Sequence, residues 1–196
     1  MDAGARWIHF VDLDFAVDAR TANLELLERI ARLPVNVQVG GGLDAEGVRS
    51  ALERGATRAI LGAAALRDMP TVAEVLERHG GRVGVGLDVH GGVIEPRGTN
   101  RAGPALDSVV PELARLGPAF VVYANVPRDG ALAGPNVEGV AGVAAALGLP
   151  VVASGGVRSV QDLVALAGIA GVAGAIVGRA LLEGAFTLDQ ALAAVA

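Results

Sequence analysis

Two aspartates are the first candidates for chemistry, because each follows a run of residues typical of a buried strand. Asp88 closes the hydrophobic run 83–87, and Asp129 stands in an Asp-Gly pair after the run 120–124. A carboxyl group partly removed from water can have a raised pKa and act as a general acid or base near neutrality. Asp129 also fits an ordinary Asp-Gly turn, whereas a charge that closes a hydrophobic strand needs a partner or a function. We take Asp88 and Asp129 as candidate catalytic residues.

Glycines that follow predicted strands are candidates for phosphate binding. A glycine pair lets backbone amides approach an anion closely, and the start of the next helix adds partial positive charge. Such glycines also form simple tight turns, but here the arrangement occurs twice at similar spacing. The first copy contains Gly41, Gly42 and Gly62, and the second contains Gly155, Gly156, Gly178 and Arg179. Two sites would suit a ligand with a phosphate at each end.

The remaining polar residues near predicted strands favour structural roles. Asp12 and Asp14 follow a strand, but no set of histidines and carboxylates accompanies them, so we expect structural hydrogen bonds rather than a metal site. His9 lies inside a predicted strand and is expected to be a core residue with its hydrogen bonds satisfied. His90 is a weaker candidate for the site, two residues beyond Asp88.

Short β-branched runs alternate with longer segments of helical period along the whole chain, which is typical of parallel strands buried between helices. Strands are expected at 7–12, 35–39, 58–61, 83–88, 120–124, 150–154 and 174–177. Helices are expected at 24–33, 45–54, 71–78, 107–116, 137–146, 160–167 and 188–195, with caps at Asp44, Asn136 and Ser159. This unbroken series predicts an α/β protein with a TIM (β/α)8-type barrel, seven of whose eight strands are present, in one domain of residues 1–196.

The composition and net charge argue against several classes of function. The net charge of −5 and the absence of cysteine argue against nucleic acid, an anionic membrane, and disulfide or thiolate chemistry. The apolar stretches are shorter than the roughly 20 residues that span a bilayer. A cytoplasmic protein with a small-molecule partner is the expectation.

Several motifs together resemble one enzyme family. Their order is that of the phosphoribosylformimino-aminoimidazole carboxamide ribotide isomerases, and the similarity runs from residue 3 to the C-terminus. The composition is also similar to the actinobacterial branch, in which one enzyme serves histidine and tryptophan biosynthesis. The motifs are Trp-Ile-His-Phe-Val-Asp-Leu-Asp (7–14), Gly-Gly-Gly (40–42), Gly-Leu-Asp-Val-His-Gly-Gly (86–92), Asp-Gly (129–130), Ala-Ser-Gly-Gly-Val (153–157) and Gly-Arg-Ala-Leu-Leu-Glu-Gly (178–184).

The resemblance implies an Amadori rearrangement of a bis-phosphorylated aminoaldose to an aminoketose, without a cofactor or metal. Phosphoribosylanthranilate would be the second substrate in the dual-function branch. Asp129 matches the family's general acid, Asp88 matches a residue that assists it, and Arg97 is a candidate partner for a phosphate. The family's base is an aspartate on its first strand, and this sequence begins after the corresponding position, so a chain truncated at its N-terminus is expected.

Two departures from the family keep other functions open. The chain has Ala124 and Ala131 where the family usually has threonine. One alternative is therefore a phosphosugar-binding relative or fragment without catalysis. Another is the sister cyclase of imidazole glycerol phosphate synthase, although the motif at Asp88 and the C-terminal motif argue against it. Seven strands would also leave two open barrel edges, which predicts self-association.

Overall fold

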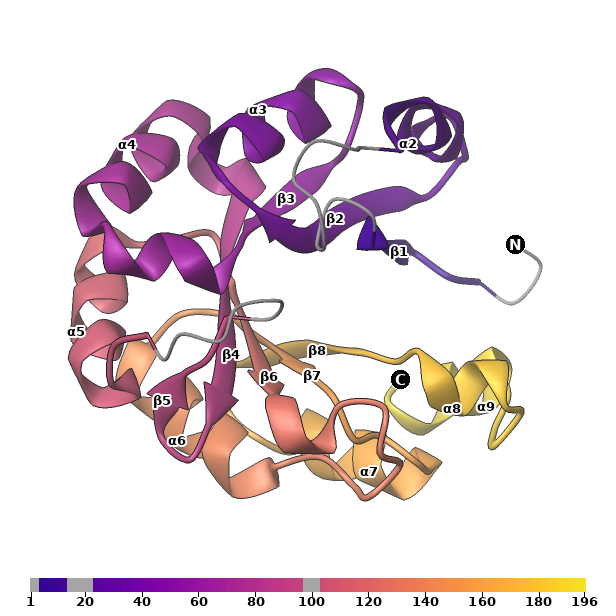
Figure 1. Ribbon diagram of the computed structural model, residues 1–196. Helices are drawn as coiled ribbons and strands as arrows, with labels where there is room; N and C mark the ends of the chain where they lie inside the picture. The colour runs from indigo at the N-terminus through magenta and orange to yellow at the C-terminus, as the bar shows by residue number, and fades with distance from the viewer. Residues whose placement is uncertain (1–3, 14–22, 97–102) are drawn as a thin grey trace.

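The computed structural model describes residues 4–13, 23–96 and 103–196, and it contains the predicted alternation of strands and helices (Figure 1). The strands are β1 (Trp7–Val11), β2 (Asn36–Leu43), β3 (Arg58–Leu61), β4 (Val83–His90), β5 (Val93–Ile94), β6 (Val121–Asn125), β7 (Val151–Ser154) and β8 (Val172–Ile176). The α-helices are α2 (Leu24–Ala31), α3 (Ala45–Glu53), α4 (Met69–His79), α5 (Leu106–Leu116), α6 (Val137–Leu147), α7 (Val160–Ala167), α8 (Arg179–Leu182) and α9 (Leu188–Ala194). Short 3-10 helices are η1 (Ala63–Arg67), η2 (Gly80–Arg82) and η3 (Val126–Arg128).

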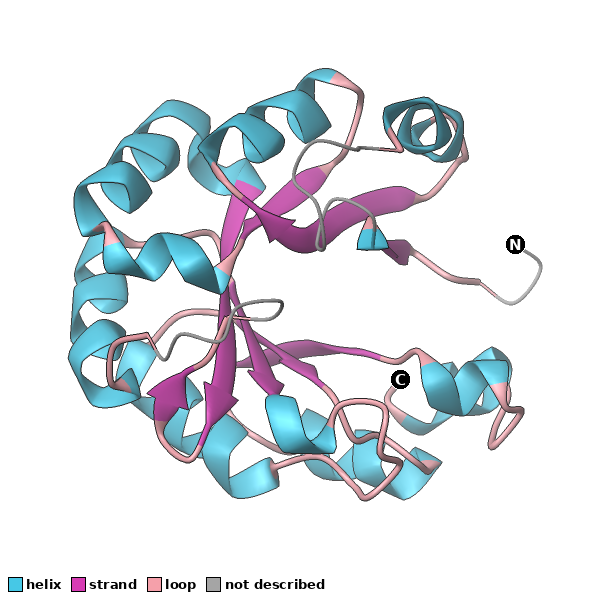
Figure 2. Ribbon diagram, in the orientation of Figure 1, coloured by secondary structure: helices cyan, strands magenta, loops and turns pink. Residues whose placement is uncertain are grey.

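The strands form one curled sheet in the order β1-β2-β3-β4-β6-β7-β8, with parallel pairing between neighbours. Strand β5 pairs antiparallel with the end of β4. The helices lie along the convex side of the sheet (Figure 2). Among the described residues β1 and β8 do not pair with each other, so the seven parallel strands form an open TIM-type barrel, as predicted.

The two faces of the sheet are packed differently. On the convex face, fully buried strand residues such as Val37, Leu61 and Val121 belong to one large core with helix residues such as Val72 and Leu113. On the concave face, a separate small cluster contains Ile60, Phe120, Val122 and Val152. The alternation of side chains along each strand therefore separates a helix-covered core from a barrel interior.

The concave face requires glycine where it approaches Phe120. A Cβ atom on Gly84 would lie only 2.4 Å from the Phe120 ring, and one on Gly86 would lie 3.5 Å from Ile60. Asp88 lies on the same face of β4 as these two glycines, because it follows them at spacings of two residues. The interior packing of β4 therefore turns Asp88 toward the barrel interior.

Helix caps and the ends of the strands decide most of the boundaries. Asp44, Asn136 and Ser159 each accept a hydrogen bond from a first-turn amide, so all three predicted caps are confirmed. Strand β2 was predicted to end at residue 39 but continues to Leu43, because the glycine run forms an irregular, bulged stretch within the pairing with β3. None of the helices that the described residues form is long and apolar enough to cross a membrane.

Candidate active site

The carboxyl ends of four strands lie level with one another. The register pairs Asp88 with Ala124, Ala124 with Ser154, and Ser154 with Ile176. Asp88 is half-buried, and its backbone carbonyl accepts a 2.7 Å hydrogen bond from the amide of Glu95 on the β4–β5 side. The half-buried carboxylate of Asp88 therefore stands one strand away from the loop that carries Asp129.

Asp129 lies in a tight turn directly after β6 and η3. The amide of Ala131 donates to the carbonyl of Arg128 at 3.0 Å. Asp129 has φ −65° and ψ 128°, and Gly130 has φ 67°. These angles define a type II turn, in which the third position requires a positive φ and so favours glycine. Asp129 is thus part of an Asp-Gly turn and is also exposed at the carboxyl end of the sheet.

The glycine turn after β7 packs directly against this loop. Gly155 and Gly156 have φ values of 89° and 85°. A Cβ atom on Gly155 would lie 3.3 Å from the Asp129 Cα, and one on Gly156 would lie 2.4 Å from the Gly134 carbonyl oxygen. The Gly134 amide also donates to the Gly156 carbonyl at 2.9 Å. Both glycines are therefore required by backbone conformation and by close packing of the Asp129 loop.

Arg179 joins the same cluster from the other side. Gly178 precedes helix α8, and Arg179 is its first residue. The Arg179 guanidinium donates through Nη1 to the carbonyl of Gly130 at 2.5 Å and through Nε to Glu183 at 2.5 Å. Loops that follow β6, β7 and β8 thus bring Asp129, Gly155, Gly156 and Arg179 together.

The first glycine copy lies on the other side of the curled sheet, at β2 and β3 (Figure 1). Gly41 and Gly42 have φ values of 109° and 75°. A Cβ atom on Gly41 would lie 2.8 Å from the carbonyl oxygen of Asp12, and one on Gly62 would lie 2.8 Å from the Gly42 backbone. Gly41, Gly42 and Gly62 therefore form a second backbone cluster, separate from the first.

Asp12 has the structural role that the sequence predicts. Its Oδ2 accepts a 2.6 Å hydrogen bond from the amide of Asn23, and its Oδ1 accepts one of 2.9 Å from the Asn23 side chain. Asn23 stands at the start of α2, so Asp12 fixes this helix to the end of β1. Asp14 and Arg97 lie outside the described residues.

His9 and His90 each form a contact with a side chain on, or directly after, the neighbouring strand. His9 Nδ1 is 2.9 Å from the side-chain amide nitrogen of Gln38. Burial, and secondarily the charge of Arg58, lowers the pKa of His9 to about 4, so this ring is neutral at pH 7. His90 is exposed, and its Nδ1 lies 2.6 Å from Glu95 across the β4–β5 hairpin. His9 is therefore the hydrogen-bonded core residue that the sequence predicts.

The sequence did not identify the residues that hold the Asp129 loop in shape. Arg128 donates through Nη1 to the carbonyl of Gly134 at 3.0 Å. Leu132 has φ 51° and is the one non-glycine residue with positive φ in the part of the chain that the structure describes. Such a conformation is costly for a bulky side chain and persists where surrounding contacts enforce it, often near functional sites. The residue types of this loop do not indicate these contacts, because every residue offers a carbonyl acceptor.

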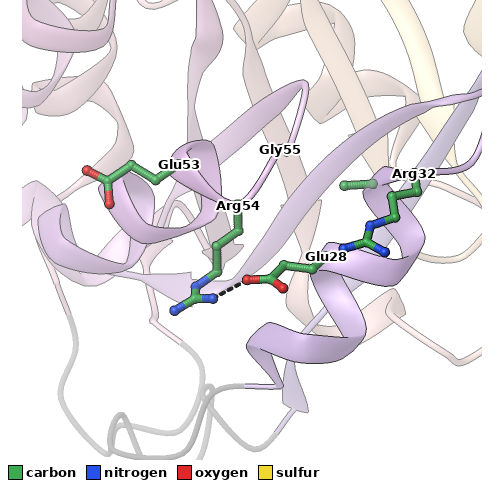
Figure 3. A pocket seen from close by; sticks show the side chains of 6 residues that line it. Glu28, Arg32, Glu53, Arg54 and Gly55 are labelled. Atoms are coloured by element: carbon green, nitrogen blue, oxygen red, sulfur yellow. Dashed lines mark hydrogen bonds and ion pairs between the residues drawn. The ribbon is translucent and has the colours of Figure 1, made fainter.

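A shallow pocket of about 340 Å³ lies away from these clusters, between the C-terminal ends of α2 and α3 (Figure 3). Glu28, Arg32, Glu53 and Arg54 supply its charged lining, and Arg54 forms an ion pair with Glu28. The ends of α2 and α3 precede β2 and β3, so this pocket is at the amino end of the strands. Asp88 and Asp129 lie at the opposite end.

The curled sheet of parallel strands, with helices along its convex side, places this protein in the class of TIM-type (β/α) barrels. The chain belongs to the histidine biosynthesis protein family, whose model matches residues 1–187.

The sequence is also similar to those of named isomerases, in agreement with this family. A 1-(5-phosphoribosyl)-5-((5-phosphoribosylamino)methylideneamino) imidazole-4-carboxamide isomerase of Parafrankia sp. (strain EAN1pec) is 47% identical, over 98% of this chain and 79% of the relative. An isomerase of the same name from Brevibacillus brevis is 42% identical, over 98% of this chain and 79% of the relative. Phosphoribosyl isomerase A of Streptomyces coelicolor is 44% identical, over 98% of this chain and 81% of the relative.

Proposed function

We propose that this chain is an aldose-ketose isomerase that carries out the Amadori rearrangement of the imidazole carboxamide aminoaldose in histidine biosynthesis. The observation that carries the proposal is the contact between the Asp129 turn and the glycine turn at Gly155, which places an exposed carboxylate beside an anion-binding type of backbone. The names of the relatives describe an isomerase of a compound with two phosphoribosyl groups.

The two glycine clusters are the proposed sites for the two phosphates. Gly41, Gly42 and Gly62 would bind one phosphate, and Gly155, Gly156, Gly178 and the backbone amide of Arg179 would bind the other. Positive φ values and the absence of Cβ atoms allow consecutive amides to turn toward one anion. Arg97 is a further proposed phosphate partner. The position of the clusters on opposite sides of the sheet supports an extended substrate held at both ends.

The proposed chemistry begins with proton transfer from Asp129 to the furanose ring oxygen. The C1–O bond then opens to a Schiff base, a base removes the proton from C2, and the resulting enolamine tautomerises to the aminoketose. Asp88 would assist from the inner face of β4, on the neighbouring strand. Asp88 lies on β4 and Asp129 lies in the turn that follows β6, and both strands are anchored in the convex core.

The test is turnover of the histidine-pathway aminoaldose by the purified 196-residue chain. We expect conversion to the aminoketose, measured by coupling to the next enzyme, and competition by inorganic phosphate. Phosphate binding by a folded sample without turnover would instead identify a phosphosugar-binding relative. Stable association with an ammonia-producing glutaminase would support the sister cyclase.

The name of one relative supports the proposal of a second substrate. The Streptomyces coelicolor protein is named for the phosphoribosyl group alone and not for the imidazole carboxamide. We therefore propose phosphoribosylanthranilate as a second aminoaldose substrate. Turnover of this compound, followed by its loss of fluorescence, would support a role in tryptophan biosynthesis, and turnover of the imidazole compound alone would contradict it.

We also propose that the chain self-associates through its open sheet edges in the cytoplasm. Trp7 and Val11 on β1 are 43% and 40% exposed, and β8 is largely exposed or half-buried. Unpaired strand edges favour pairing with another chain. Light scattering after size-exclusion chromatography should show dimers or larger species, and a monodisperse monomer that melts cooperatively at high temperature would contradict this.

A further inference from the structure

We propose that the Arg179 side chain is a positioning residue for Asp129, an inference that rests on the proposed isomerase function. Arg179 begins α8 after β8, whereas Gly130 lies in the loop after β6. The guanidinium Nη1 nevertheless donates to the Gly130 carbonyl at 2.5 Å. One arginine thus joins the two loops on either side of the Gly155 turn.

A hydrogen bond to the Gly130 carbonyl should strongly affect the conformation of the turn that contains Asp129. Gly130 directly follows Asp129 and occupies the third position of the type II turn, where the backbone has φ 67°. Glycine has the widest conformational freedom of any residue, so an unanchored turn here would sample several orientations. A charged donor on this carbonyl restricts the Gly130–Ala131 peptide, which closes the turn that contains Asp129, and so restricts the direction of the carboxylate.

Glu183 orients the guanidinium for this contact. It accepts from Arg179 Nε at 2.5 Å, which leaves Nη1 directed at Gly130. The side chains of Arg179 and Glu183 are 55% and 48% exposed, and such surface pairs contribute little to global stability. We therefore expect this contact to affect the orientation of Asp129 and not the free energy of unfolding of the protein.

The contacts of the Gly155 turn extend the link to the proposed phosphate site. Gly155 touches Asp129, and Gly156 exchanges backbone contacts with Gly134 in the same loop. The backbone of Arg179 serves the proposed phosphate site, while its guanidinium holds the loop of the acid. Occupation of the phosphate site and alignment of Asp129 are thereby coupled through one residue.

The test compares Arg179→Met and Arg179→Lys with a matched control, Arg49→Met. Arg49 is also a helical arginine paired with glutamates, Glu46 and Glu53, and its side chain is 42% exposed, but it lies on α3. Arg179→Met should lower kcat about tenfold to a hundredfold, the cost of a slightly misplaced catalytic group, with KM little changed. Hydrogen exchange of residues 126–134 should become faster. Lysine should restore part of kcat, because it keeps one charged donor without the planar fork, and Arg49→Met should match the wild type in all three measurements.

Two results would overturn the proposal. Unchanged kcat and unchanged exchange in Arg179→Met would show that the Gly130 contact does not position the loop. A rise in KM and weaker competition by inorganic phosphate, with kcat and exchange unchanged, would show that the guanidinium binds phosphate instead. If the wild type has no turnover, the proposed function fails, and the exchange measurement alone still decides whether Arg179 holds the loop.

Discussion

Asp12 and Asp129 occupy similar places in the two halves of the sheet. Asp12 follows β1 and packs its backbone against Gly41, and Asp129 follows β6 and packs against Gly155. Their side chains differ, because Asp12 is only 6% exposed and its oxygens accept two hydrogen bonds from Asn23, whereas Asp129 is exposed. Similar places in the two halves thus hold a buried aspartate that fixes a helix in one half and an exposed aspartate at the carboxyl end of the sheet in the other.

The interior of the barrel also differs between the two halves. In the N-terminal half, His9, Gln38 and Arg58 stand side by side in register on β1, β2 and β3. The Arg58 guanidinium lies 4.0 Å from the ring centres of both Trp7 and Phe120. In the C-terminal half, Val122 on β6 and Val152 on β7 belong to the apolar interior cluster. The first half should therefore respond to pH through His9 in its interior.

The largest expected effect is the loss of activity in Asp129→Asn. Removal of a general acid should lower kcat about a hundredfold to ten-thousandfold, while the exposed position should keep the change in unfolding free energy within about 0.5 kcal/mol. Kinetic assays and urea titrations measure the two quantities.

The matched variant Asp12→Asn should show the reverse. It disturbs the buried contacts with Asn23 and should cost about 2 kcal/mol of stability, with kcat of the folded fraction retained. Turnover that survives in Asp129→Asn but disappears in folded Asp12→Asn would reverse the assignment of scaffold and chemistry to the two halves.

Gly156→Ala and Gly42→Ala compare the two glycine turns directly. Both positions have positive φ, but a Cβ atom would meet the Gly134 carbonyl at 2.4 Å in the first case and nothing within 4 Å in the second. Gly156→Ala should cost about 3 kcal/mol from strain plus displacement of the Asp129 loop, and Gly42→Ala about 1 kcal/mol from strain alone. Thermal and urea unfolding measure both, and equal losses would show that loop packing does not distinguish the turns.

His9 makes the N-terminal half sensitive to acid. Its pKa is about 4 in the folded protein and 6.5 in the unfolded chain, so the unfolded chain binds the proton first. The contribution of His9 to stability should be constant above pH 6.5, fall as the pH drops from 6.5 toward 4, and decrease by about 3 kcal/mol across that window. His9→Gln removes this contribution, so its urea midpoint should vary less than that of the wild type between pH 7 and pH 5. Identical pH profiles would exclude His9 as the source.

The sequence predicted the elements that depend on local patterns. Strand Arg58–Leu61 and helix Val160–Ala167 were predicted with their observed bounds, because hydrophobic period and capping residues define them locally. The hairpin strand β5 and the four-residue helix α8 were missed, since they are too short to carry a periodic signal and depend on contacts with distant residues.

The proposed site could also be predicted from the sequence only in part. Asp129 and the glycine turns could be found from type and spacing, because a strand end followed by a charge or by glycines is visible in sequence. The contacts of Arg179 with Gly130 and of Arg128 with Gly134 could not, since a carbonyl acceptor leaves no mark on residue type. Tertiary geometry alone decides which arginine reaches which backbone oxygen.

The smallest expected difference concerns the helix caps that follow the two glycine turns. Asp44 caps α3 through a 2.8 Å bond from Gly47, whereas at α7 Ser159 shares the capping box with Asp162, which accepts from the amides of Arg158 and Ser159. Asp44→Ala should therefore cost about 1 kcal/mol, and Ser159→Ala about 0.5 kcal/mol, because Asp162 keeps its own bonds. Urea titration of both variants and of Ser159→Ala combined with Asp162→Ala measures the difference. A loss in Ser159→Ala as large as in Asp44→Ala would show that Asp162 gives the second half no additional support.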